Sequence, residues 1–134
     1  MNKIFEKLTN QLTETIDSSV ALALHNKNQE VEVIHLLWAL LSNTNSVLNQ
    51  LLNKMNVNKV AVELEAKSYA SKLPSVSSVT KESIKLSRNL LSSLQSAEGL
   101  MASFGDKFIA VDTWLISNLD SSVIKDVLGK YVDL

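Results

Sequence analysis

The sequence predicts an all-α domain that contains two similar halves. Three observations support this fold class: helix-breaking residues are rare, apolar residues recur at helical spacing, and the second half repeats the apolar pattern of the first. The 134 residues include three glycines and one proline, so little in the chain interrupts a helix. A chain of this length is large enough to form one domain with its own apolar core.

Composition excludes several kinds of protein. The chain has no cysteine, which removes disulfides, thiolate metal sites and cysteine nucleophiles. Thirteen basic residues balance fourteen acidic ones without a clustered basic face, which argues against nucleic acid as a partner. No apolar run reaches the roughly 18 residues of a membrane span, and the start of the chain lacks the core of a signal peptide. We expect a cytoplasmic domain that is monomeric in isolation and does not bind a membrane.

Four helices are predicted in the first half. The first carries a stripe with spacings of three and four, capped by Asn2 or Thr9, and a polar break at 25–30 ends it. A short helix follows at about 33–41, and Ser46 caps a third helix that carries five apolar residues on one side. Asn58 caps a fourth helix, which ends by Leu73 because Pro74 disfavours helical geometry in the residue before it.

The second half restarts after a linker at 74–79. A capping-box-like stretch at 80–83 is expected to open a long helix, whose stripe consists of Leu86, Leu90, Leu94, Ala97, Met101 and Phe104. An offset of 78 residues superimposes the apolar positions of the two halves as far as Leu119, and an offset of 76 continues the match. Because three helices and the breaks between them match in order, the sequence predicts a tandem duplication, with halves at about 2–73 and 80–134.

The fourth helix of the second half would begin where the sequence ends, at Leu134. The duplication therefore predicts that this half lacks its last helix within the given sequence, and that the polypeptide continues. Without that helix, we expect apolar surface to be exposed near Val127 and Tyr131.

His35 is the first residue to test as a site, because it interrupts the apolar run "VEVIHLLWALL" at 31–41. Its counterpart in "IAVDTWLISNL" at 109–119 is Thr113, so the imidazole is not part of what the halves share. The spacing of the two histidines predicts no metal site. Trp38 and Trp114 lie in the same apolar runs, which predicts core packing.

Catalytic motifs are missing from the sequence. There is no phosphate-binding loop, and no serine lies in a G-x-S-x-G turn, so we expect neither an ATPase nor any other enzyme. One alternative stays open, a small enzyme or ligand carrier with a closed cavity lined by His35 and a carboxylate.

The two apolar runs also carry a family resemblance. "VEVIHLLWALL" resembles the E-P-x-H-L-L-x-A-L-L signature of the Clp repeat, the N-terminal domain of Clp chaperone ATPases, with Val33 where the family usually has proline. "LTN" at 8–10 and "GDKFIAVDTWL" at 105–115 are similar to the branch represented by ClpB, the protein disaggregase. The resemblance implies a fold of two pseudo-repeated four-helix units.

The resemblance also implies a function. A domain of this kind binds exposed hydrophobic segments of unfolded or aggregated proteins for the hexameric ATPase ring of its parent, without chemistry or cofactors of its own. ATP and magnesium belong to the ATPase modules of the parent, and the DnaK chaperone system would act through its other domains. The alternative is an adaptor-docking domain, as in the protease-partnered ClpA and ClpC branches.

The same resemblance implies a set of site residues. It places substrate contacts at Thr9, Asp106 and Asp112, and we expect Leu12 and Ile16 to supply the apolar contact beside them. The first half has Asn28 and Ile34 at the positions of the two aspartates, which favours a site on one half only. A second interpretation of the aspartates is that their charge stabilises the start of a helix.

Overall fold

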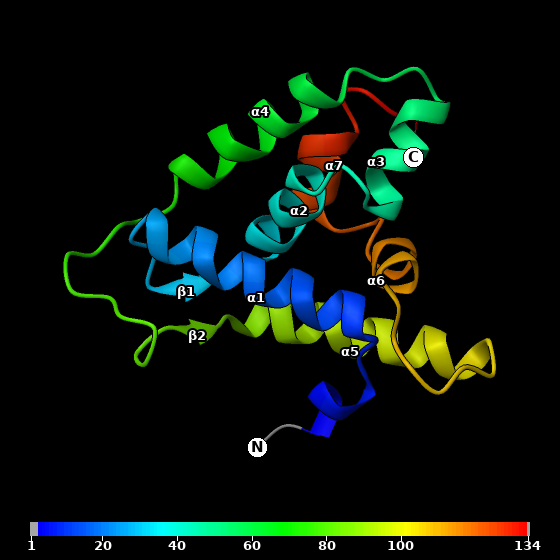
Figure 1. Cartoon of the computed structure of the whole chain (residues 1–134), viewed down its shortest axis with the longest axis horizontal. Coiled ribbons are helices and arrows are strands. Elements are labelled where there is room, and N and C mark those ends of the chain that lie inside the picture. Colours follow the sequence, from blue (N-terminus) through cyan, green and yellow to red (C-terminus); the bar gives the residue numbers. More distant parts are fainter. Residues whose placement is uncertain (1–2, 134) are drawn as a thin grey trace.

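The computed structural model describes residues 3–133, and its secondary structure is mainly α-helical, as predicted (Figure 1). In chain order the elements are η1 (Lys3–Lys7), α1 (Asn10–His25), β1 (Glu30–Val31), α2 (Val33–Ser42), α3 (Val47–Lys54), α4 (Lys59–Ser71), β2 (Lys85–Leu86), α5 (Arg88–Ser103), α6 (Val111–Ser117) and α7 (Ser122–Leu128). Within residues 3–133, every helix is too short or too polar to cross a membrane.

Helix α2 forms the centre of the molecule. Every residue from Val33 to Leu41 is buried, because α2 contacts α1, α3, α4, α5 and α7. Figure 1 shows α2 between α4 on one side and the long helices α1 and α5 on the other. A helix that is apolar on all sides requires this position, since any exposed side would leave hydrocarbon in water.

Three predicted caps position the helices of the first half. The side chains of Thr9, Ser46 and Asn58 accept backbone N–H groups at the starts of α1, α3 and α4. Each satisfies a donor that has no partner within its own helix, so the caps fix where these helices begin. Asn2, the other predicted cap of α1, lies outside the described residues.

The predicted start of the second long helix is wrong. Residues 80–83 form a turn, in which the N–H groups of Ser83 and Ile84 donate to the carbonyl of Thr80 at 3.1 and 2.9 Å. Helix α5 begins later and is capped by Ser87. Leu86, which the prediction placed in the helical stripe, lies in β2 because its strand pairs with β1.

The two halves are joined by matching contacts. β1 and β2 pair in parallel, and a parallel bridge joins Leu8 to Ile109 at positions shifted by the same offset. In each contact, the cap of a long helix donates its N–H to a carbonyl of the other half: Ser87 to Val31 at 2.9 Å, and Thr9 to Ile109 at 3.0 Å. Each long helix is therefore anchored by the opposite half. The duplication itself stays a prediction.

The exposed apolar surface is only partly where it was predicted. Val127 is fully buried, because α4 packs against both α2 and α7, whereas Tyr131 is 36% exposed. A further exposed apolar area lies on two other helices: Leu51 of α3, Met55 at its C-terminal cap and Ile116 of α6 are 44%, 51% and 52% exposed. We call these three residues the α3–α6 surface.

Candidate functional site

The predicted polar site residues lie near the contact between the start of α1 and the loop that follows α5. Thr9 is half-buried, and its N–H donates to the carbonyl of Ile109. The N–H of Ile109 in turn donates to the carbonyl of Lys7 at 2.6 Å. Asp106 lies in the loop after α5, Asp112 lies in the first turn of α6, and both are exposed.

Two of these polar residues also have local structural roles. The hydroxyl of Thr9 accepts the N–H of Leu12 at 3.2 Å as the cap of α1. Asp112 Oδ1 accepts the N–H of Thr113 at 2.9 Å, and the capping position of α6, Ala110, supplies no side-chain acceptor. A carboxylate near the positive end of a helix is stabilising, as the second interpretation of the aspartates expected.

Leu12 and Ile16 belong to the core. They are 0% and 7% exposed on the inner side of α1. This burial corrects the expectation that they offer apolar contact to a bound polypeptide, because neither presents surface in this conformation. The spacing of the α1 stripe identified the buried side of the helix, and a buried side is not a binding surface.

Phenylalanine supplies the exposed apolar surface at this place. The chain has three phenylalanines, and Phe5, Phe104 and Phe108 are 38%, 56% and 54% exposed. Phenylalanine is among the residues most often buried, and exposed apolar side chains that gather together are typical of interaction sites. Phe104 and Phe108 flank Asp106 in the loop after α5, and η1, which carries Phe5, contacts α5. We call these three phenylalanines the phenylalanine surface.

The sequence contained a signal for this surface. At the offset of 78 residues, each phenylalanine has a polar counterpart in the other half: Ser83 for Phe5, Asn26 for Phe104 and Glu30 for Phe108. The aromatic character is thus not repeated, and the counterparts of Phe104 and Phe108 lie in the polar break of the first half. Sequence analysis assigned Phe104 to a helical stripe and gave no role to the other two phenylalanines.

Gly105 sets the turn between the aromatic residues. It has a φ of 76°, a left-handed conformation in which a side chain is strained, and it directly follows Phe104, the last capping residue of α5. The N–H of Asp106 donates to the carbonyl of Met101 at 3.1 Å, which closes the helix end. Phe104 and Asp106 are therefore held on a defined turn.

His35 has a structural role, as its replacement in the second half predicted. It is fully buried, its Nδ1 accepts the N–H of Glu32 at 2.8 Å, and its Nε2–H donates to Asn28 Oδ1 at 2.9 Å. Burial lowers the pKa of His35 to about 4, so the ring is neutral at pH 7. Asn28 Nδ2 donates to the carbonyl of Pro74 at 3.1 Å, which ties α2 to the segment after α4.

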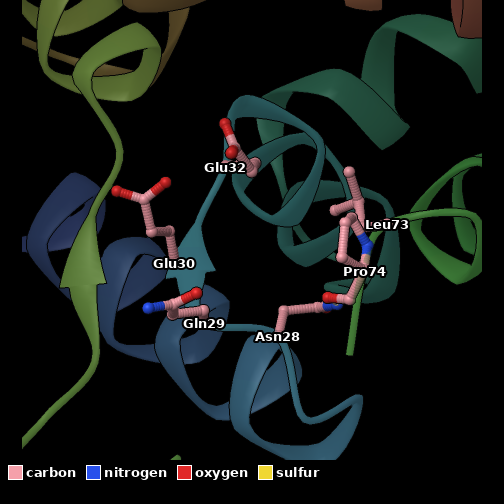
Figure 2. Close-up of a pocket in the computed structure, with 6 residues that line it drawn as sticks. All are labelled: Asn28, Gln29, Glu30, Glu32, Leu73 and Pro74. Atoms are coloured by element: carbon pink, nitrogen blue, oxygen red, sulfur yellow. Dashed lines mark hydrogen bonds between the residues drawn. The ribbon is translucent and has the colours of Figure 1, made fainter. Parts of the chain in front are cut away.

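The pocket beside this network does not resemble a catalytic site. Figure 2 shows its lining of Asn28, Gln29, Glu30, Glu32, Leu73 and Pro74, with the Asn28 amide directed toward Pro74. His35 is absent from the lining, so the closed cavity required by the enzyme or carrier alternative is not found here. Among residues 3–133, no three His, Asp or Glu side chains are grouped closely enough to hold a metal ion.

Both tryptophans pack in the core, as predicted. Trp114 is fully buried and its Nε1–H donates to Ser93 Oγ at 2.9 Å, while Trp38 is 6% exposed. Neither ring is available for stacking on a ligand.

Comparison with known proteins places the chain in a family. Residues 7–131 match the family described as Clp repeat (R) N-terminal domain. The chain is 55% identical to the chaperone protein ClpB of Wolinella succinogenes over 130 residues and 52% identical to that of Helicobacter hepaticus over 131 residues. These matches cover 97% and 98% of the chain and 15% of each relative, so the chain spans about 15% of their length.

Solved structures show the same fold at low sequence identity. The N-terminal domain of a ClpV ATPase from Escherichia coli superimposes with a TM-score of 0.84 at 17% identity, covering 98% of this chain and 80% of that one. A ClpV N-domain in complex with a VipB peptide superimposes with a TM-score of 0.75 at 18% identity, covering 97% and 82%. The family match, the ClpB relatives and the shared fold together establish that this chain belongs to the Clp N-terminal domain family.

Proposed function

We propose that this chain is the substrate-recognition domain of a ClpB-type disaggregase and binds exposed hydrophobic segments of unfolded or aggregated proteins. The observation that carries the proposal is the phenylalanine surface: every phenylalanine of the chain is exposed, on η1 and in the loop after α5, and backbone bonds from Ile109 join these two segments at Lys7 and Thr9. The peptide complex of a ClpV N-domain supports it, because that domain has this fold and binds a peptide.

The proposed mechanism is binding without chemistry. Partly exposed aromatic rings gain free energy when an apolar segment covers them, and Asp106 and Asp112 accept hydrogen bonds from backbone N–H groups of an unfolded chain. A small, open surface of this kind binds weakly and with little selectivity. Several copies in a hexameric parent would raise the effective affinity.

The parent protein supplies the remaining activity under this proposal. The ATPase modules of the parent would bind ATP and magnesium and pull on the segment that this domain delivers. Cooperation with the DnaK chaperone system would take place through other domains. The domain itself would need no cofactor and would work in the cytoplasm as a monomeric unit of its parent.

A titration with a permanently unfolded protein, reduced and alkylated lactalbumin, tests the proposal by NMR. We expect amide shifts to cluster at residues 5–9 and 104–112. The double variant Phe104→Ser with Phe108→Ser should bind at least about tenfold more weakly, because two half-exposed rings each contribute on the order of 1–2 kcal/mol when covered. Asp106→Ala with Asp112→Ala should weaken binding by a smaller factor.

A matched control uses the exposed aliphatic residues of α4. Val60 and Leu64 are 59% and 60% exposed, so Val60→Ser with Leu64→Ser removes similar apolar surface elsewhere and should leave binding unchanged. If the control variant loses as much affinity as the phenylalanine variant, the assigned surface is wrong. If a single folded adaptor binds with nanomolar affinity and the unfolded protein does not bind, the adaptor-docking function replaces the proposal.

A further inference from the structure

A second surface lies at the other end of the long helices from the loop after α5. A cleft of about 410 Å³ opens between α1 and the turn that precedes β2. Its lining residues are Asp17, Val20, Val31, Lys81, Ile84 and Leu86. Figure 1 shows β2 beside β1 near one end of the molecule, while the loop after α5 lies at the opposite end. The cleft is therefore separate from the phenylalanine surface.

The floor of the cleft is aliphatic and partly open. Val20, Ile84 and Leu86 are half-buried and pack against the hydrophobic core, and Val31 below them is fully buried. Three partly covered aliphatic side chains leave hydrocarbon that a bound side chain could remove from water. The cleft thus has apolar attraction at its centre.

Strand β2, which contributes Leu86 to the lining of the cleft, also has an open edge. Ser87 donates its N–H to the carbonyl of Val31, which lies on β1. Because the N–H groups of successive strand residues point to opposite sides, the N–H and C=O of Leu86 point away from β1. Among residues 3–133, β2 has β1 as its one strand partner. An added strand would find a donor and an acceptor at Leu86.

Opposite charges stand at the margins of the cleft. Asp17 comes from α1 and Lys81 from the turn before β2, and both are exposed. The ion pairs formed within residues 3–133 involve neither of them. A ligand that carries a cation at one end and an anion at the other would therefore complement the two margins.

The equivalent place in the other half carries charged side chains in place of aliphatic ones. At the offset of 78 residues, Glu98 stands where the cleft has Val20, and Glu6 stands where it has Ile84. There Lys7 forms an ion pair with Glu98 across η1 and α5. The aliphatic floor is therefore not a general consequence of the fold but belongs to this edge alone.

We propose that this cleft binds a short extended segment of a separate polypeptide, which adds a strand to β2. The segment has an aliphatic centre over Val20 and Ile84, a basic residue beside Asp17 and an acidic residue beside Lys81. Main-chain hydrogen bonds to Leu86 supply affinity, and the two charges fix the direction of the segment. This proposal is independent of the function proposed for the phenylalanine surface.

A pair of peptides tests the direction of binding. Acetyl-Lys-Val-Thr-Val-Glu-amide and acetyl-Glu-Val-Thr-Val-Lys-amide have the same composition but opposite charge order. We expect one of them to bind about three- to tenfold more tightly, the combined effect of two exposed ion pairs. The tighter peptide should shift the amide signals of Val20, Ile84 and Leu86 in NMR spectra of the whole chain.

A double charge exchange sharpens the test. Asp17→Lys combined with Lys81→Asp should reverse the preference between the two peptides. The control exchange Asp120→Lys with Lys67→Asp alters exposed charges outside the cleft and should leave the preference unchanged. Val20→Glu introduces the residue that the other half has at this position, Glu98, and should abolish binding of both peptides.

Four outcomes would overturn the proposal. Equal binding of the two peptides would contradict the proposed contribution of the charges to binding. An unchanged preference in the Asp17–Lys81 exchange variant would contradict it as well. Binding that survives Val20→Glu places the peptide outside the cleft. If neither peptide binds but light scattering shows self-association that Val20→Glu abolishes, the cleft is a contact between copies of this chain instead.

Discussion

His35 illustrates how a buried polar side chain is held in this protein. Its two ring nitrogens contact Glu32 and Asn28, and Asn28 also contacts Pro74, so one imidazole connects three segments of the first half. Thr113 occupies the same position in the second half and is also buried. The two halves therefore share the burial of this position and differ in the polar group that fills it.

The neutral state of His35 predicts an acid sensitivity. Its pKa is about 4 in the folded protein, against 6.5 in the unfolded chain, so the unfolded chain binds more protons between these values. The contribution of neutral His35 to the free energy of unfolding is therefore complete above pH 6.5 and is lost as the pH falls toward 4. Urea unfolding should show a loss of about 2 kcal/mol at pH 5, relative to pH 7, that is absent in His35→Gln.

His25 provides the control for this measurement. It lies at the exposed end of α1, and His25→Gln should keep the pH dependence of the original protein. Equal pH dependence of His35→Gln and the original protein would contradict the assignment to His35.

At the scale of elements, the ends of the two long helices are built alike but with different residues. Lys27 after α1 and Gly105 after α5 both adopt left-handed backbone, with φ of 58° and 76°. The helix ends are then closed by equivalent bonds, from Asn28 to Ala23 and from Asp106 to Met101. Glycine adopts this conformation without strain, whereas lysine does not.

Two glycines of this region should respond oppositely to the same change. Gly105→Ala should destabilise the protein by about 1 kcal/mol, because alanine is strained at positive φ. Gly99 lies inside α5 with no atom near the position of an added Cβ, so Gly99→Ala should stabilise it by about 0.5–1 kcal/mol. Thermal unfolding of both variants measures the difference, and a shift in the same direction for both would contradict the assignment.

At the scale of the whole molecule, the two halves are unequally covered. Helix α4 lies over α2 and α7, and Trp38 on α2 is 6% exposed. Ile116, at the equivalent position on α6, is 52% exposed, and Leu51 on the neighbouring α3 is 44% exposed. The α3–α6 surface is therefore the place that corresponds to the one covered by α4.

The predicted second four-helix unit gives this surface a role. In a polypeptide of the 163 residues that the ClpV domain has, we predict that a helix covers Ile116 and Leu51. Their methyl signals should become protected from a soluble paramagnetic probe, and the free energy of unfolding should rise. Val60 and Leu64 on α4 should stay accessible as the internal control. Unchanged access at Ile116 in the longer polypeptide would contradict the prediction.

The sequence predicted much of the fold because local chemistry determines it. Thr9, Ser46 and Asn58 were recognisable as caps, and the apolar spacing of α1 identified its buried side. The same spacing failed for α4, where Val60 and Leu64 are exposed and Val62 is buried. The start of α5 was not predictable in this way, because Ser83 and Ser87 both have the chemistry of a cap. Strand pairing between the halves selected Ser87, and that contact joins residues far apart in the chain.

The candidate site likewise contains residues that the sequence indicated and residues whose exposure only the structure revealed. The sequence by itself determined the fold class and the family, since these depend on residue type and spacing. Thr9, Asp106 and Asp112 stay a prediction that the family resemblance implies. Only the tertiary structure decided that Leu12 and Ile16 are buried and that the three phenylalanines are exposed. An apolar residue carries the same hydrophobicity in either place, and its exposure depends on which other elements pack over it.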